Sequence, residues 1–128
     1  MIKKILLSSA LLILPNISHA TSDKTQCLAR IIYSEARGES KEGQLAIGYA
    51  SINRAKRSNK HLCKIRGVTA HEPSEKLKPF FYQLARLSLN SHSTIGTADS
   101  WNVKKIPHDR GKKVKKIGAH VFYIMSKL

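Results

Sequence analysis

CLARIIYSEARGE, at residues 27–39, is the most informative stretch of this 128-residue chain. Apolar residues recur in it at helical spacing, at Leu28, Ile31 and Ile32. Gly38 is a natural terminator, so we predict a helix over about residues 25–37. Glu35 falls on the apolar stripe of that helix, where a carboxylate is costly unless it is neutral, paired or hydrogen-bonded. Its position marks Glu35 either as a perturbed acid or as half of a surface pair with Glu39.

Two more helices are predicted after the first. Ser40 is expected to cap a second helix whose apolar positions extend to Ile52, and Gly48 within it indicates close packing against the first helix. Residues 55–67 are rich in Lys and Arg with little apolar periodicity, so we expect a basic connector there. A third helix with a broad apolar face is expected over about residues 73–90.

The last third of the chain lacks sustained helical periodicity. Gly and Pro punctuate residues 91–111, which predicts a long loop of the kind that often carries function. In residues 114–128, the apolar run from Val121 to Met125 favours a short buried strand or an extended core segment, with a terminal helical turn as the alternative. The fold class expected from these elements is mostly α (α+β), in one small domain.

The charge is strongly basic. Lys and Arg total 23 against 8 Asp and Glu, which gives a net charge of +15. Such a balance indicates an anionic partner, namely a nucleic acid, a membrane surface or an acidic polymer such as cell-wall glycan. A cluster of four lysines near the C-terminus predicts a solvated cationic face: Lys112, Lys113, Lys115 and Lys116.

The N-terminus predicts export. Two lysines precede an apolar run at residues 5–14, and small residues follow at positions 18 and 20. We therefore expect a signal peptide at residues 1–20 and a mature domain at residues 21–128, whose net charge falls to +13 with the loss of Lys3 and Lys4. An uncleaved anchor is the alternative, but the run is too short to span a bilayer. The expected location is the periplasm or the extracellular wall, without stable membrane insertion after cleavage.

Two cysteines, Cys27 and Cys63, remain in the mature chain. In an oxidising compartment this even number predicts a disulfide, with free thiols or metal ligands as alternatives. Neither cysteine has a second ligand at zinc-site spacing, so we expect no metal.

Motifs for nucleophilic serine, phosphate-loop and zinc-protease chemistry are absent, which leaves the carboxylates as candidate catalytic groups. Cleavage of a glycosidic bond needs an acid that protonates the leaving oxygen, and burial against apolar neighbours keeps a Glu protonated near neutral pH. Glu35 fits that role.

Several segments also carry a resemblance in order and spacing: CLAR at 27–30, YSEARGE at 33–39, EGQLA at 42–46, NR at 53–54 and IGAHVFY at 117–123. Over about residues 26–125 the chain resembles the spore-cortex-lytic (SleB-like) cell-wall hydrolase family. The resemblance implies a lysozyme-like catalytic domain that cuts peptidoglycan between N-acetylmuramic acid and N-acetylglucosamine. It also implies a single catalytic Glu, carried here by Glu35, lytic transglycosylase chemistry with 1,6-anhydro products, and no metal or cofactor.

The loop before the C-terminal motif departs from this pattern. Many relatives carry Gly-Ala-x-x-aromatic-His there, whereas this chain reads GTADSWN at 96–102. Asp99 is either a second carboxylate for a hydrolytic mechanism or a loop cap. Trp101 is either a platform for a sugar ring or a core anchor, and Asn102 is a candidate substrate contact.

Other candidate substrate contacts lie on either side of this loop. Glu39 is a candidate for the substrate site, with a structural ion pair as the alternative. His120 and Tyr123 either line the cleft or hold the last segment in place. Asn53 and Arg54 are expected to hydrogen-bond across to the first helix.

The primary hypothesis is therefore an exported, monomeric lytic transglycosylase acting on peptidoglycan strands. A hydrolytic muramidase with a second carboxylate and a non-catalytic cationic wall-binding module are the alternatives. A nucleic-acid-binding protein is supported by charge alone and opposed by the export signal and the cysteine pair.

Overall fold

The structure is a computed structural model that describes residues 21–128. The predicted signal peptide at residues 1–20 lies outside the described residues. Helix α1 (Asp23–Ala36) forms where the apolar stripe predicts it, and Ser22 caps its first turn by accepting a hydrogen bond from the Thr25 amide. The stripe residues of α1 are fully buried in the core.

Helix α2 (Lys41–Ser58) begins after the Ser40 cap, as predicted, but is longer than expected. It includes the start of the expected basic connector, because the charged side chains there face solvent while Ala55 packs into the core. Gly48 faces Ser88 at the point of closest approach and also lies near Ile32 of α1. The tight packing that Gly48 permits is therefore mainly against the third helix, not against α1 as expected.

Helix α3 (Lys78–Asn90) starts later than predicted, because residues 75–77 form a turn. Pro79 lies in its first turn, where the missing N–H costs nothing. A helix begun at residue 74 would place this proline in its interior, where it breaks a backbone hydrogen bond. The Phe81 ring of α3 packs edge-on against Tyr33 of α1, with ring centroids 5.2 Å apart.

A three-stranded antiparallel sheet completes the fold. Strand β3 (His120–Met125) confirms the predicted C-terminal strand, and the alternative of a terminal helical turn is wrong. Strand β1 (Ser100–Asn102) lies within the expected loop, and β2 (Gly111–Ile117) forms a hairpin with β3. The order is β1-β3-β2, so lysine-rich β2 is an edge strand, where exposed charge opposes pairing with other chains.

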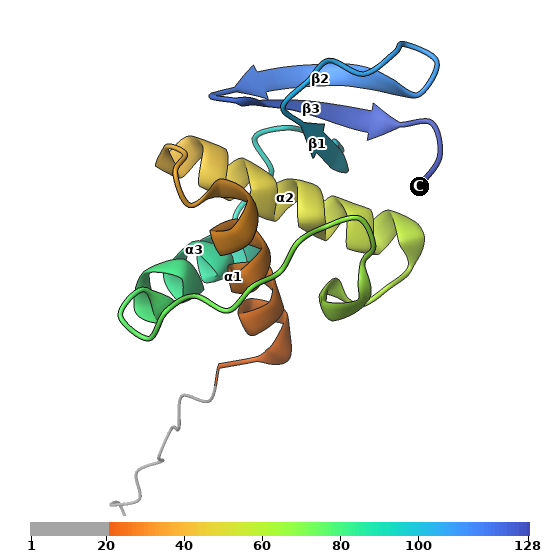
Figure 1. Cartoon of the computed structure of the whole chain (residues 1–128). Helices are drawn as coiled ribbons and strands as arrows, with labels where there is room; N and C mark the ends of the chain where they lie inside the picture. Colours follow the sequence, from red (N-terminus) through yellow and green to blue (C-terminus); the bar gives the residue numbers. More distant parts are fainter. Residues whose placement is uncertain (1–20) are drawn as a thin grey trace, which may run out of the picture.

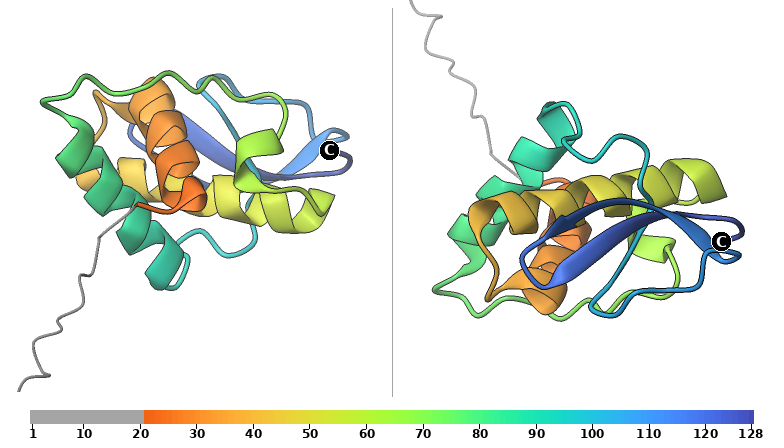
Figure 2. Two further views of the ribbon diagram at one scale, coloured as in Figure 1. Left: turned by 90° about the horizontal axis from the view of Figure 1, so that it is seen from below. Right: turned by 90° about the horizontal axis from the view of Figure 1, so that it is seen from above.

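Helix α2 lies between the sheet on one side and helices α1 and α3 on the other (Figure 1). After α2 comes a short helix, η2 (Leu62–Lys64), and residues 65–77, hereafter the strap, then run beside the C-terminal half of α1 to reach α3 (Figure 2). This architecture confirms the mostly α (α+β) class. Within residues 21–128, every helix is too short or too polar to cross a membrane.

Candidate active site

Glu35 lies in the last turn of α1, half-buried between the strap and the sheet. Its Oε1 accepts a hydrogen bond from the Thr69 amide of the strap at 2.9 Å. Its Oε2 accepts one from the indole Nε1 of Trp101, in β1, at 3.1 Å. Each carboxylate oxygen has two lone pairs, so one on each oxygen remains available for a proton or a substrate. The carboxyl group is thus oriented from two sides without being fully occupied.

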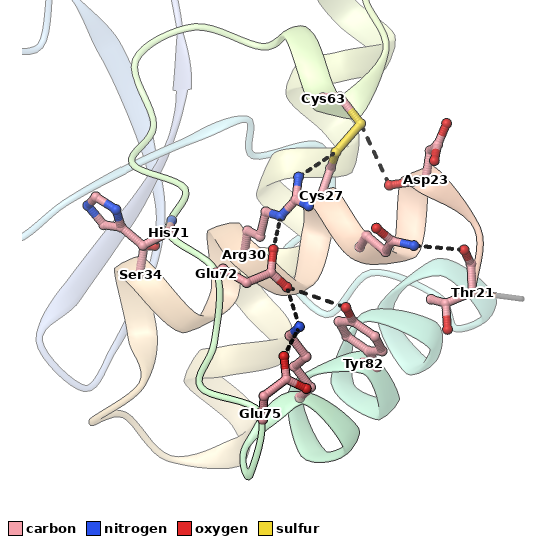
Figure 3. Close-up of polar contacts among 12 residues, drawn as sticks. Thr21, Asp23, Cys27, Arg30, Ser34, Cys63, His71, Glu72, Glu75 and Tyr82 are labelled. Atoms are coloured by element: carbon pink, nitrogen blue, oxygen red, sulfur yellow. Dashed lines mark hydrogen bonds and ion pairs between the residues drawn. A yellow bond between two sulfur atoms is a disulfide. The ribbon is translucent and has the colours of Figure 1, made fainter.

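The chain is attached to α1 just before the strap and again within it (Figure 3). A disulfide between Cys27 of α1 and Cys63 of η2 confirms the predicted pairing and fixes the chain just before the strap. Two residues after Thr69, the His71 amide donates a hydrogen bond to the Ser34 hydroxyl. The strap residues that face Glu35 therefore lie between two attachments to the same helix.

Glu72, the residue after His71, also attaches the strap. Its Oε2 lies 2.5 Å from Arg30 Nε of α1, and its Oε1 lies 3.7 Å from Lys78 Nζ (Figure 3). The hydrogen bond from Arg30, together with the charges of Arg30 and Lys78, lowers the pKa of the Glu72 carboxyl. Glu72 is therefore ionised near neutral pH and holds the strap against both α1 and α3.

An open cavity of about 590 Å³ borders this arrangement on the Trp101 side. Basic, apolar and small polar side chains from α2, the strap and the sheet region line it: Arg54, Ser58, Lys60, Arg66, Gly67, Ser100, Trp101, Asn102, Ile106, Tyr123, Met125, Lys127 and Leu128. Trp101 lines the cavity and also contacts Glu35, so this side chain links the carboxyl group to the cavity, although Glu35 itself is not a lining residue.

Arg54 of α2 organises the cavity wall. Its guanidinium donates to the carbonyls of Asp99 and Arg66 and to the Ser100 hydroxyl. Its Cζ also lies 5.2 Å from the centroid of the Trp101 ring. Burial lowers the pKa of Arg54, and the negative charges of Asp99 and Glu35 oppose that shift. The expectation that Arg54 bonds to the first helix is wrong, since its partners lie in the strap and at β1.

Asn53 likewise bonds away from α1. Its amide nitrogen donates to the carbonyls of Gly96 and Ala98, so the expected bond to the first helix is also wrong here. These two hydrogen bonds hold the loop that leads into β1. Asn53 and Arg54 together fix the position of Trp101 through the backbone on either side of Asp99.

Asp99 points into the protein and is 1% exposed. Its carboxylate pairs with Arg57 and accepts hydrogen bonds from the Ser100 hydroxyl at 2.9 Å and the Met125 amide at 3.1 Å. These partners join α2, β1 and β3. A carboxylate with this burial and this set of partners is placed to hold the sheet on α2, and it is not among the residues that line the cavity.

Glu39 and His120 lie together at the turn between β2 and β3. Glu39 Oε1 accepts a hydrogen bond from the Ala119 amide at 3.1 Å and lies 3.8 Å from His120 Nδ1. Gly118, with a φ of 58°, leaves room for this carboxylate, which a side chain at that position would strike. Glu39 thus joins the α1–α2 junction to the hairpin, and neither Glu39 nor His120 lines the cavity.

The remaining candidates, Asn102 and Tyr123, both line the cavity. Asn102 is exposed, and its side-chain oxygen accepts from the Lys104 amide. Tyr123 is 2% exposed, and its hydroxyl accepts from the Ile106 amide at 3.0 Å. Trp101, Asn102 and Tyr123 are therefore the predicted residues that the structure brings together in one cavity, and Trp101 links them to Glu35.

One contributor to the site has no individual signal in the sequence. Thr69 acts through its backbone amide, which any residue except proline supplies. Arg54 belongs to the NR segment that carries the resemblance, but its hydrogen-bond partners are distant in the chain and no local pattern indicates them. In residues 21–128, no group of three or more His, Cys, Asp or Glu side chains is arranged to hold a metal ion.

Two solved structures have folds similar to that of this chain. The catalytic domain of the Bacillus cereus SleB protein matches with a TM-score of 0.62 and 23% identity, covering 78% of this chain and 88% of that one. The catalytic domain of the germination-specific lytic transglycosylase SleB from Bacillus anthracis matches with a TM-score of 0.60 and 20% identity, covering 86% and 99%. No protein-family model and no curated protein matches the chain. The chain therefore has the fold of the SleB catalytic domain over most of its length.

Proposed function

We propose that this chain is an exported, monomeric lytic transglycosylase that cleaves peptidoglycan between N-acetylmuramic acid and N-acetylglucosamine, with Glu35 as its single catalytic residue. The observation that carries the proposal is a half-buried carboxyl group oriented by the strap and by Trp101, whose side chain also lines an open cavity. The fold shared with a germination-specific lytic transglycosylase supports it. The disulfide supports an oxidising, extracytoplasmic location, in agreement with the predicted signal peptide.

In the proposed reaction Glu35 acts first as an acid. It transfers its proton to the glycosidic oxygen while the bond from that oxygen to the muramoyl anomeric carbon breaks through an oxocarbenium-like transition state. The Glu35 carboxylate then removes the proton of the muramoyl 6-hydroxyl, whose oxygen bonds to the anomeric carbon. The products are a 1,6-anhydro sugar and a free 4-hydroxyl, and Glu35 recovers its proton. The cycle consumes no water and needs no second carboxylate.

The proposal assigns supporting roles to the residues around Glu35. Trp101 orients the carboxyl group and, with Asn102, offers a surface for the sugar. Asp99, Glu39 and His120 hold the sheet and its hairpin in place, which differs from the substrate-site roles considered from the sequence. This assignment rests on their hydrogen bonds to the sheet and its hairpin.

The decisive experiment is digestion of purified peptidoglycan with the wild-type protein and with Glu35→Gln. The wild type should release muropeptides lighter by one water than hydrolytic products, and Glu35→Gln should release none while keeping its circular dichroism spectrum. Reducing-end products from the wild type would instead identify a muramidase. Binding to peptidoglycan without release of fragments would identify a wall-binding module.

A further inference from the structure

The cavity that Trp101 lines is strongly cationic. Four basic side chains line it, from Arg54, Lys60, Arg66 and Lys127, and no Asp or Glu of the described chain does. A concave site with such a balance focuses a positive potential on whatever enters it.

The positive charge of the cavity is not neutralised from within. Among the ion pairs of residues 21–128, none involves Lys60, Arg66 or Lys127. All three of these side chains belong to exposed residues, so a ligand can reach them. Arg54 uses three of its guanidinium N–H groups in the wall, which leaves two of its five donors.

The volume of the cavity and its apolar lining residues indicate the size and the chemistry of the ligand. A volume of about 590 Å³ is in the range of small-molecule sites and accommodates a few amino-acid residues. Trp101, Ile106 and Met125 give it an apolar surface between the charges. The matching ligand is short, carries several negative groups and has aliphatic parts between them.

We propose that this cavity binds the carboxylates of the peptide attached to muramic acid, so that the enzyme selects strands whose stem peptides are present and anionic. The inference rests on the proposed function, because Trp101 both contacts Glu35 and lines the cavity, so a muramoyl residue cleaved by Glu35 would lie near the cavity. The peptide extends from the lactyl group on muramoyl O3 and leaves the 6-hydroxyl free. A phosphodiester-linked wall polymer attached to the 6-hydroxyl would block the proposed cyclisation, which favours the stem peptide as the source of negative charge.

The test distinguishes the effect of the cavity cations from the effect of positive charge elsewhere on the protein. Arg66→Gln/Lys127→Gln removes two cavity cations while keeping the Arg66 carbonyl that Arg54 binds. Lys76→Gln/Arg86→Gln removes two exposed cations outside the cavity and is the matched control. Each protein is assayed on intact strands and on strands whose peptide carboxylates have been converted to methylamides. The readouts are kcat and KM for release of anhydro-muropeptides.

Methylamidation should raise the wild-type KM by about tenfold, the scale expected for two partly exposed charge contacts. The cavity variant should show that increase on intact strands, no further change on methylamidated strands, and an unaltered kcat. The control should behave as the wild type. Equal increases for the cavity variant and the control, or for the cavity variant on both substrates, would overturn the inference.

A binding measurement decides the inference even without turnover. Glu35→Gln is titrated with a soluble disaccharide-tripeptide, its methylamide and a glycerol-phosphate polymer. Tighter binding of the native tripeptide, lost in a variant that also carries Arg66→Gln and Lys127→Gln, supports the cavity assignment whether or not the wild type cleaves strands. Equal binding of the tripeptide and its methylamide refutes it, as does a cavity-dependent preference for the phosphate polymer. Absence of cleavage by the wild type, in contrast, refutes the proposed function alone.

Discussion

The indole N–H of Trp101 donates to Glu35 Oε2 across 3.1 Å, which joins the single tryptophan of the chain to the carboxyl group at the end of α1. Arg54 lies over the face of the same ring, and the carbonyl of Asp99 accepts from Arg54. The orientation of Glu35 therefore depends on β1 and α2 as well as on its own helix. This dependence makes the role of Trp101 testable by removing one hydrogen bond.

Trp101→Phe should lower kcat for anhydro-product release by about tenfold, because an aromatic ring remains but the N–H donor is lost. The KM should change little, since the cavity cations that we assign to substrate binding are untouched. Steady-state kinetics on intact strands gives both constants, and thermal unfolding checks the fold. A raised KM with an unchanged kcat would limit Trp101 to sugar binding and contradict its role in positioning Glu35.

Glu72→Gln should weaken the attachment of the strap in a pH-dependent way. Its folded-state pKa is lowered, so the stability from its ion pair is present above the unfolded value of about 4.3 and is lost as the pH falls through the folded value. Because Glu72 and Arg30 are both partly exposed, the variant should lose about 0.2–1 kcal/mol near neutral pH.

The measurement is denaturant unfolding of the wild type and Glu72→Gln at a series of pH values. The two free energies of unfolding should converge in acid, where the wild-type carboxyl is also neutral. A difference that stays constant from pH 7 to strongly acidic pH would show that the ion pair is not its source. Glu75→Gln, at an exposed carboxylate of the adjoining turn, is a suitable comparison.

Features that depend on nearby residues could be predicted from the sequence. The stripe of Leu28, Ile31 and Ile32 specifies which face of α1 is buried, and this face brings Glu35 inward. The even number of cysteines in a chain predicted to be exported was sufficient to pair Cys27 with Cys63. These features depend on residues within a few helical turns or on a covalent bond, so they can be predicted without knowledge of the fold.

Features that depend on distant partners could not be predicted in this way. Strand β2 has the sequence GKKVKKI, and it is exposed along most of its length, so no alternation of polar and apolar residues marks it as a strand. In the sequence, Asp99 has no feature that distinguishes it from other loop residues. The fold brings Arg57 and the Met125 amide to its carboxylate. The amide of Thr69 reaches Glu35 because the chain is attached to α1 on both sides of Thr69. No local sequence pattern indicates these attachments.

Replacing both Cys27 and Cys63 by Ser should lower the free energy of unfolding by about 4 kcal/mol, the chain-entropy value for a closed loop of 36 residues. Activity at moderate temperature should also fall, because the start of the strap is released from α1. Denaturant unfolding with and without a reducing agent measures the first effect. The reductant should destabilise the wild type to the level of the double variant and leave that variant unchanged, and an unresponsive wild type would contradict a stabilising disulfide.

Asp99→Asn separates a structural carboxylate from a second catalytic one. The substitution keeps the shape of the side chain but removes the charge that faces Arg57, so the protein should lose about 1–3 kcal/mol of stability, as for hydrogen bonds to charged groups. Its kcat should stay within a few-fold of the wild type at a temperature where both are folded, and its products should remain anhydro sugars. Glu35→Gln should show the opposite pattern, with intact stability and no turnover. A folded Asp99→Asn protein without activity would instead make Asp99 the second carboxylate of a hydrolytic muramidase.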